Sequence, residues 1–97
     1  MSYEDVVVRL GDLLAHTQRF ALAERYFEQA AELVDDPLAK TPLIERAGEM
    51  ALRGSRMPEA RDLLNRALTA YESAGQPRLA AHVSAQLADI DHFEGRH

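Results

Sequence analysis

The chain has 97 residues, of which 46% are hydrophobic and 28% are charged, a composition typical of one soluble globular domain and unlike that of a disordered chain. Its formal net charge of −5 argues against nucleic-acid binding, and the absence of cysteine excludes disulfides, thiolate catalysis and cysteine-ligated metals. It has neither a basic signal-peptide start nor an apolar run of membrane-spanning length, so we expect a cytoplasmic protein without membrane association.

Five segments of helical periodicity follow one another, so the sequence predicts an all-α fold with five helices. Ser2 is the predicted N-cap of the first helix, which ends near Thr17 and Gln18. The later boundaries are marked by Asp36-Pro37, Thr41-Pro42, Gly54 with Pro58, and Gly75 with Pro77. The apolar stripes expected to be buried are, helix by helix, Val6, Leu10, Leu13 and Leu14; Tyr26, Phe27, Ala30, Leu33 and Val34; Ile44, Ala47, Ala51 and Leu52; Leu63, Leu64, Ala67, Leu68 and Tyr71; and Leu79, Val83, Leu87 and Ile90.

An internal repeat relates the first two predicted helices to the next two. Gly11 and Gly48 lie 48 − 11 = 37 residues apart, and Phe27 and Leu64 keep the same offset. Further pairs at this offset are Asp12 with Glu49, Arg19 with Arg56, Ala23 with Ala60, and Ala30 with Ala67. A unit of two helices therefore occurs twice, followed by a single helix.

The repeated residues resemble the tetratricopeptide repeat family. The resemblance rests on Leu10-Gly11, Ala23, Phe27 and Ala30 in the first unit, and on Ala47-Gly48, Ala60, Leu64 and Ala67 in the second. The chain departs from the family pattern at Val7 and Ile44, where tryptophan is common, at Ala47, which replaces leucine, and at Leu64, which replaces an aromatic residue. The offset also exceeds the usual ~34 residues, and we expect the extra residues to lengthen a loop from Asp35 to Thr41.

This resemblance implies antiparallel helix-turn-helix repeats stacked as a short right-handed solenoid. We expect one domain over residues 1–97, with repeat one at about residues 4–37, repeat two at about 41–75, and a half repeat or capping helix at about 77–97. In the family, the first helix of each pair lines a concave face that binds a protein partner. Carried over, that face includes Val8, Asp12, His16, Glu45, Glu49, Leu52, Arg53, Asp89, His92 and Phe93.

Three acids, Asp12, Glu49 and Asp89, fall at equivalent positions on the expected face. They favour a basic or amphipathic peptide or helix as partner. The alternative is that these acids only solvate an exposed surface. The chain lacks the lysine, arginine and asparagine set with which some family members hold a C-terminal carboxylate, so we expect no binding of such tails.

The last predicted helix suggests a second function. Leu79, Val83, Leu87 and Ile90 form an apolar side that could pair with a copy of itself, giving a homo-oligomer. Alternatively, the chain is a piece of a longer protein, or this helix is a plain cap whose polar side faces water.

No constellation for catalysis is recognisable, so we predict no enzyme, no catalytic residue and no cofactor. The chain has no Gly-x-Ser-x-Gly motif and no phosphate-binding loop. Asp89 and His92 share a helix face as two metal ligands would, but helical metal sites usually need a second such pair. His82 is too far from His92 to share an ion, and we therefore predict no metal site.

Overall fold

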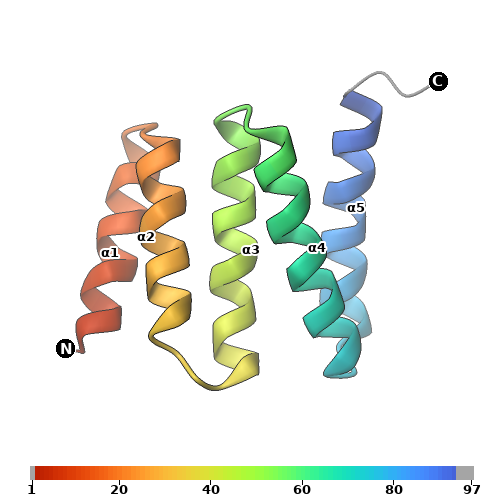
Figure 1. Ribbon diagram of the computed structural model, residues 1–97, viewed down its shortest axis with the longest axis horizontal. Coiled ribbons are helices and arrows are strands. Elements are labelled where there is room, and N and C mark those ends of the chain that lie inside the picture. Colours follow the sequence, from red (N-terminus) through yellow and green to blue (C-terminus); the bar gives the residue numbers. More distant parts are fainter. Residues whose placement is uncertain (1, 94–97) are drawn as a thin grey trace.

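Residues 2–93 are described by a computed structural model, in which they form five α-helices and no strand (Figure 1). Consecutive helices run antiparallel, and the predicted all-α class is confirmed. Residues 94–97 of the predicted half repeat lie outside the described residues. The helices are α1 (Tyr3–His16), α2 (Phe20–Glu32), α3 (Pro37–Arg53), α4 (Met57–Ser73) and α5 (Pro77–Phe93).

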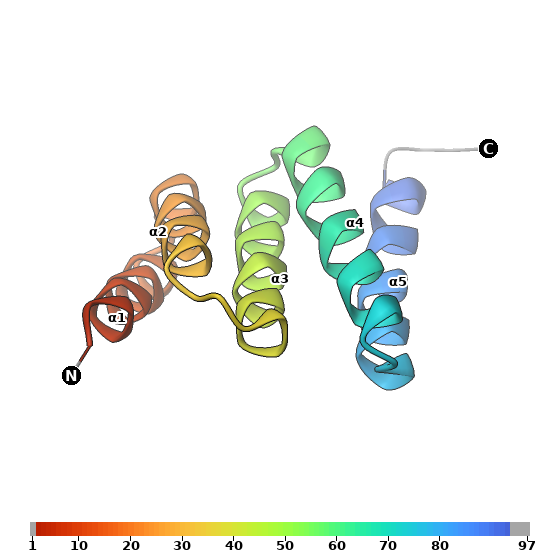
Figure 2. The same cartoon turned by 60° about the horizontal axis from the view of Figure 1, so that its bottom comes forward.

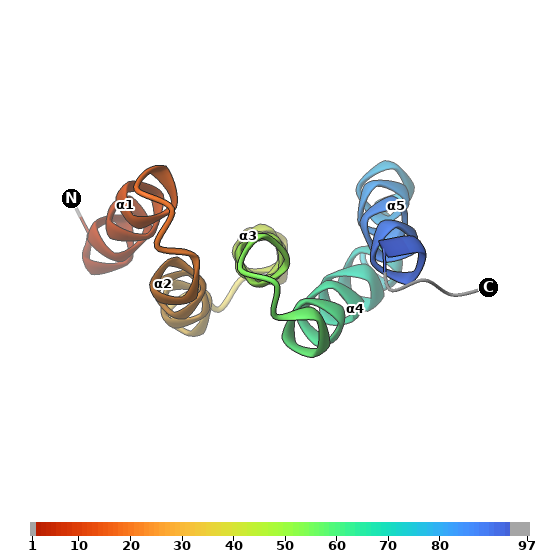
Figure 3. The same ribbon diagram turned by 90° about the horizontal axis from the view of Figure 1, so that it is seen from above.

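The helices stand in one row, in chain order. Each packs mainly against its neighbours in the sequence, and the molecule measures 47 × 33 × 17 Å. The order along the long axis is also clear in Figure 2. Seen from above in Figure 3, α1, α3 and α5 lie on one side of the row and α2 and α4 on the other, with α3 set back between α1 and α5. We call the side formed by α1, α3 and α5 the odd-helix face.

Two glycines allow close approach within the helix pairs. A Cβ atom at Gly11 would lie 2.9 Å from the Phe27 ring, and one at Gly48 would lie 2.9 Å from the Leu64 side chain. Because real Cβ contacts are longer than this, only glycine fits at either crossing without a shift. The same contact therefore occurs at the same 37-residue offset in α1–α2 and in α3–α4.

The turns inside the two pairs also match. Gln18 and Ser55 both have φ of 62°, a left-handed conformation that is unusual for residues other than glycine. The N–H groups of Arg19 and Arg56 close the turns by donating to the carbonyls of Leu14 and Ala51, each at 2.8 Å. The predicted end of α1 near Thr17 is confirmed, as is Ser2 as its N-cap, with a capping box to Asp5. Hydrogen bonds from Ser2 lower the pKa of the Asp5 carboxyl.

The predicted long loop between α2 and α3 is wrong. α3 already begins at Pro37, so the extra residues extend that helix to 17 residues, against 14 in α1. Proline suits the first helical position because its ring fixes φ and no hydrogen bond is lost there. The Thr41 hydroxyl donates to the Pro37 carbonyl at 2.7 Å, and the helix continues through Pro42, which was predicted to be a boundary.

The predicted buried side of α1 is wrong for three of its four residues, whereas Leu14 does pack against the core. Val7 and Gly11 face the core, whereas Val6, Leu10 and Leu13 are 40%, 40% and 60% exposed. α1 stands at the end of the row and packs mainly against α2, so only one of its sides is covered.

Buried alanines and a few large side chains fill the space between neighbouring helices. Phe27, Leu64, Tyr71, Val83 and Ile90 are the largest side chains that are almost completely buried. Glu24 of α2 is also buried, and Arg56 Nε, at the start of α4, donates to its Oε1 at 2.9 Å. This ion pair links the turn between α3 and α4 to α2. Within residues 2–93, no helix is both long and apolar enough to span a membrane.

Candidate functional site

A groove of about 570 Å³ lies between α1 and α3 on the odd-helix face. Four residues predicted for the binding face line it: Asp12, His16, Glu49 and Arg53. Its other lining residues are Ala15, Gln18, Phe20, Arg46 and Met50. The fold therefore brings together predicted residues from both repeats, although they are more than thirty positions apart in the sequence.

The charges in this groove are mixed. Arg46, which the sequence analysis did not single out, forms an ion pair with Asp12. Its guanidinium group also lies 4.2 Å from the centre of the Phe27 ring, a cation–π distance. Asp12 and Glu49 are thus balanced by Arg46 and Arg53, so the acids do not form an uninterrupted acidic row in this groove.

Glu45 is held below this surface. It is 9% exposed, and the Tyr71 hydroxyl donates to its Oε1 at 3.0 Å. Burial raises the pKa of Glu45, with a smaller contribution from the charge of Glu49, and burial likewise raises the pKa of Tyr71. Glu45 was predicted to contact a partner, but it does not line the groove and lies instead in a cluster with two other side chains.

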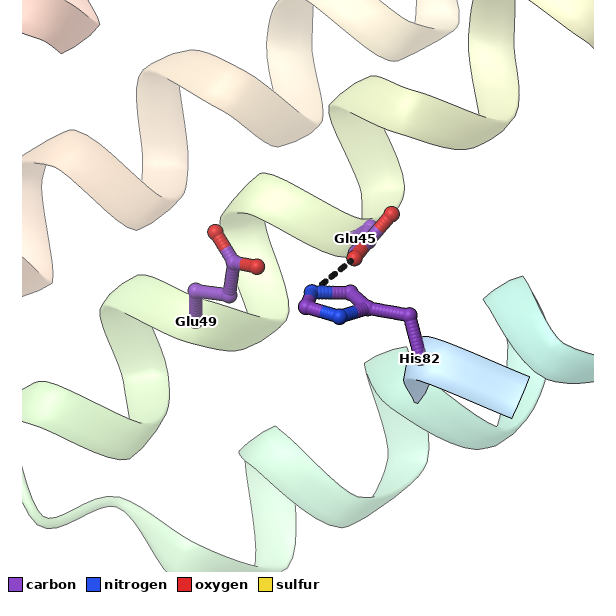
Figure 4. A group of neighbouring side chains, drawn as sticks. All are labelled: Glu45, Glu49 and His82. Carbon is purple, nitrogen blue, oxygen red and sulfur yellow. Dashed lines mark ion pairs between the residues drawn. The ribbon is translucent and has the colours of Figure 1, made fainter. Parts of the chain in front are cut away.

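Glu45, Glu49 and His82 form this cluster, drawn in Figure 4. One nitrogen or carboxylate oxygen of each residue, an atom that could ligate a metal, lies within 4.8 Å of the other two. His82 Nε2 is 3.6 Å from Glu45 Oε2. Gln86, one turn after His82, donates from Nε2 to Glu49 Oε2 at 2.9 Å. The sequence analysis missed this cluster because it compared His82 only with His92. The two i,i+4 pairs, Glu45 with Glu49 and His82 with Gln86, could have revealed it.

The other predicted groove residues are dispersed. Val8 and Leu52 are partly buried against the core, while Asp89 and His92 are exposed and do not line the groove. The side chain of Phe93 lies outside the described part of the structure.

The residues predicted for self-association through α5 need correction. Val83 and Ile90 are completely buried in the chain's own core, and Leu87 packs against it, because this side of α5 faces the neighbouring helices. Leu79 is 42% exposed. The more exposed apolar side belongs to α1, where Tyr3, Val6, Leu10 and Leu13 form one stripe.

Comparison with protein-family models, with curated protein sequences and with solved structures finds no match to this chain. Its function must therefore be inferred from its own residues and their arrangement.

Proposed function

We propose that this chain is a tetratricopeptide-like interaction module, a short right-handed solenoid whose odd-helix face binds a peptide or helix of a protein partner. The groove between α1 and α3 carries the proposal, because it joins equivalent positions of two repeats in one surface. The shared glycine crossings and left-handed turns support the repeat assignment.

The lining of the groove favours an amphipathic, partly basic segment. Phe20, Ala15 and Met50 supply apolar surface, and charged side chains of both signs surround it. Asp12 is already paired with Arg46, so Glu49 and the exposed Asp89 are the acids that a basic partner would reach. Charges at the rim of such a site select the partner, while apolar contacts provide most of the affinity.

A selection from displayed amphipathic peptides tests this proposal, carried out in buffer that contains a metal chelator. We expect basic amphipathic peptides to be enriched and to lose binding when Asp12, Glu49 and Asp89 are changed together to lysine. The matched control changes Asp35, Asp62 and Glu72 to lysine, since these exposed acids lie on α4 or in the α2–α3 loop and do not line the groove. A selection that enriches no peptide, or binding at low salt that survives the first triple reversal in a folded protein, contradicts the proposal.

Self-association is a second candidate function, and the exposed stripe of α1 favours it. Tyr3, Val6, Leu10 and Leu13 are 40–63% exposed and follow the a and d spacing of two heptads. The positions 37 residues later are Lys40, Leu43, Ala47 and Met50 of α3, where α2 packs alongside, and Ala47 and Met50 are buried there. We infer that a helix of a second copy covers the stripe on α1.

Light scattering across a concentration series tests self-association. We expect a dimer that Leu10→Glu and Leu13→Glu dissociate, whereas Leu79→Glu on α5 does not. A monomer at every concentration contradicts self-association, and a dimer that only Leu79→Glu dissociates contradicts the role of α1.

A further inference from the structure

We propose that Glu45, Glu49 and His82 bind a divalent transition-metal ion of the Zn²⁺ type, which bridges α3 and α5 on the odd-helix face. The cluster supplies one imidazole nitrogen and two carboxylates (Figure 4). Imidazole nitrogen and carboxylate oxygen are both Zn²⁺ ligands, and three protein ligands with a fourth position for water are typical of open Zn²⁺ sites. The proposal goes beyond peptide binding and departs from the sequence prediction of no metal site, which considered only Asp89 and His92.

The separation of the ligand atoms suits such an ion after small side-chain rotations. Zn²⁺ bonds of about 2.0–2.2 Å in a tetrahedral site place neighbouring ligand atoms about 3.4 Å apart. His82 Nε2 and Glu45 Oε2 are already 3.6 Å apart, and all three ligand atoms lie within 4.8 Å. The His82 side chain is 63% exposed, so it can rotate toward Glu49 without disturbing the core.

Both carboxylates are held by hydrogen bonds from other side chains. Tyr71 donates to Oε1 of Glu45, which leaves Oε2 on the side of His82. Gln86 donates to Oε2 of Glu49 and so holds this carboxylate against α5. Hydrogen bonds of this kind fix the ligands of metal sites and tune their affinity.

The electrostatic surroundings also favour a cation. Two carboxylates lie together here, and among the described residues neither Glu45 nor Glu49 has an ion pair with an arginine or lysine. Arg46, the nearest arginine in the sequence, pairs with Asp12 instead. A bound divalent ion would neutralise both carboxylates.

The amide of Gln86 adds an observation from α5, beside the cluster. Its Oε1 is buried and has no hydrogen-bond partner, although the Nε2 of the same amide holds Glu49. Buried acceptors without partners are rare in folded proteins and call for an explanation. The amide that holds Glu49 thus keeps one acceptor for a donor that no described residue supplies.

The experiment is a titration of the full chain, stripped of metal, with ZnCl₂ by calorimetry and with CoCl₂ by visible absorption. We expect one ion per chain, a Co²⁺ spectrum of low coordination number, and a rise in melting temperature because the ion binds the folded state. His82→Ala and Glu49→Gln should each weaken binding at least tenfold. Tyr71→Phe, which removes only the hydroxyl that positions Glu45, should weaken it by about 10–100-fold.

Asp89→Asn combined with His92→Ala is the matched control and should leave binding unchanged. Circular dichroism checks that each variant is folded, and His82→Ala changes an exposed side chain, so this variant tests the site without disturbing the core. Absence of 1:1 binding overturns the proposal, as does equal affinity in folded His82→Ala or loss of binding in the control variant. The peptide selection is carried out with chelator, so the two proposals fail independently.

Discussion

The helix pairs α1–α2 and α3–α4 carry the same pattern and differ in what surrounds them. In both, a glycine meets a large side chain and a residue at φ 62° turns the chain. However, Leu13 of α1 is 60% exposed, whereas Met50, its equivalent in α3, is 5% exposed. Because α3 stands between α2 and α4 and α1 stands at the end of the row, the place in the row decides which apolar residues are buried.

Truncating Met50 and Leu13 to alanine should give the largest difference in the free energy of unfolding between the two pairs. We expect Met50→Ala to lower the free energy of unfolding by about 2–5 kcal/mol, the usual cost of a core truncation. Leu13→Ala should change it by less than about 0.5 kcal/mol, as for most surface substitutions. Urea unfolding at low protein concentration, where self-association is minimal, measures both. Equal losses in the two variants would contradict the difference in burial.

Replacing the two crossing glycines, Gly11 and Gly48, with leucine should give a smaller difference in stability between the pairs. Gly48→Leu forces a side chain against Leu64 and should destabilise the protein by about 1–3 kcal/mol, the usual cost of overpacking. Gly11→Leu meets Phe27 in the same way, but α1 has no neighbour on its other side and can tilt away, so we expect a smaller loss. Thermal unfolding compares the two, and an unchanged melting temperature for Gly48→Leu would refute the equivalence of the crossings.

The number of helices and the glycine positions could be predicted from the sequence because periodicity and the 37-residue offset are local patterns. The covered side of α1 could not, since Val6 and Val7 are equally apolar and only the neighbouring helix selects Val7. Pro37 and Pro42 looked like breaks, although proline is tolerated near a helix start.

The candidate site was predictable only in part. Asp12 and Glu49 were found because they share the repeat offset, and both line the groove. Arg46 was missed because its role depends on contacts with Asp12 and Phe27 of another helix pair. The cluster around His82 was missed because its ligands come from α3 and α5: i,i+4 pairs in the sequence mark one side of each helix, but the fold brings these sides together.

Substituting glycine for the left-handed turn residues should have a still smaller effect on stability, and of opposite sign, because it should stabilise the protein. Ser55→Gly removes the strain of a side chain at φ 62° and should stabilise the protein by about 0.5–1 kcal/mol. Gln18→Gly in the first pair should do the same. The matched control is Ser73→Gly in the last turn of α4, which should destabilise because glycine disfavours a helix. Thermal unfolding distinguishes the signs, and destabilisation by Ser55→Gly would show that the serine is not strained.

The smallest expected effect depends on pH and on one further difference between the pairs. Burial, and then the charge of Glu24, raise the pKa of Glu28, whereas the equivalent residue of α4 is the exposed and uncharged Asn65. Since the folded state disfavours the charged form, the stability that Glu28 contributes is fully present below its unfolded pKa of about 4.5 and is lost as the pH rises through the higher folded value. Glu28→Gln should therefore stabilise the protein at pH 7 and make little difference at pH 4.

Urea unfolding at the two pH values measures this change. Asn65→Glu is the matched control, because a carboxylate at this exposed position stays hydrated in the folded state and should alter stability little at either pH. If Glu28→Gln had the same effect at pH 7 and pH 4, ionisation would not be its cause. The greater length of the residue 28 side chain, and its packing, would then be what distinguishes this position from Asn65. A pH-dependent gain confined to Glu28 would instead show that α2 and α4, although built on one repeat, bury their equivalent polar positions to different depths.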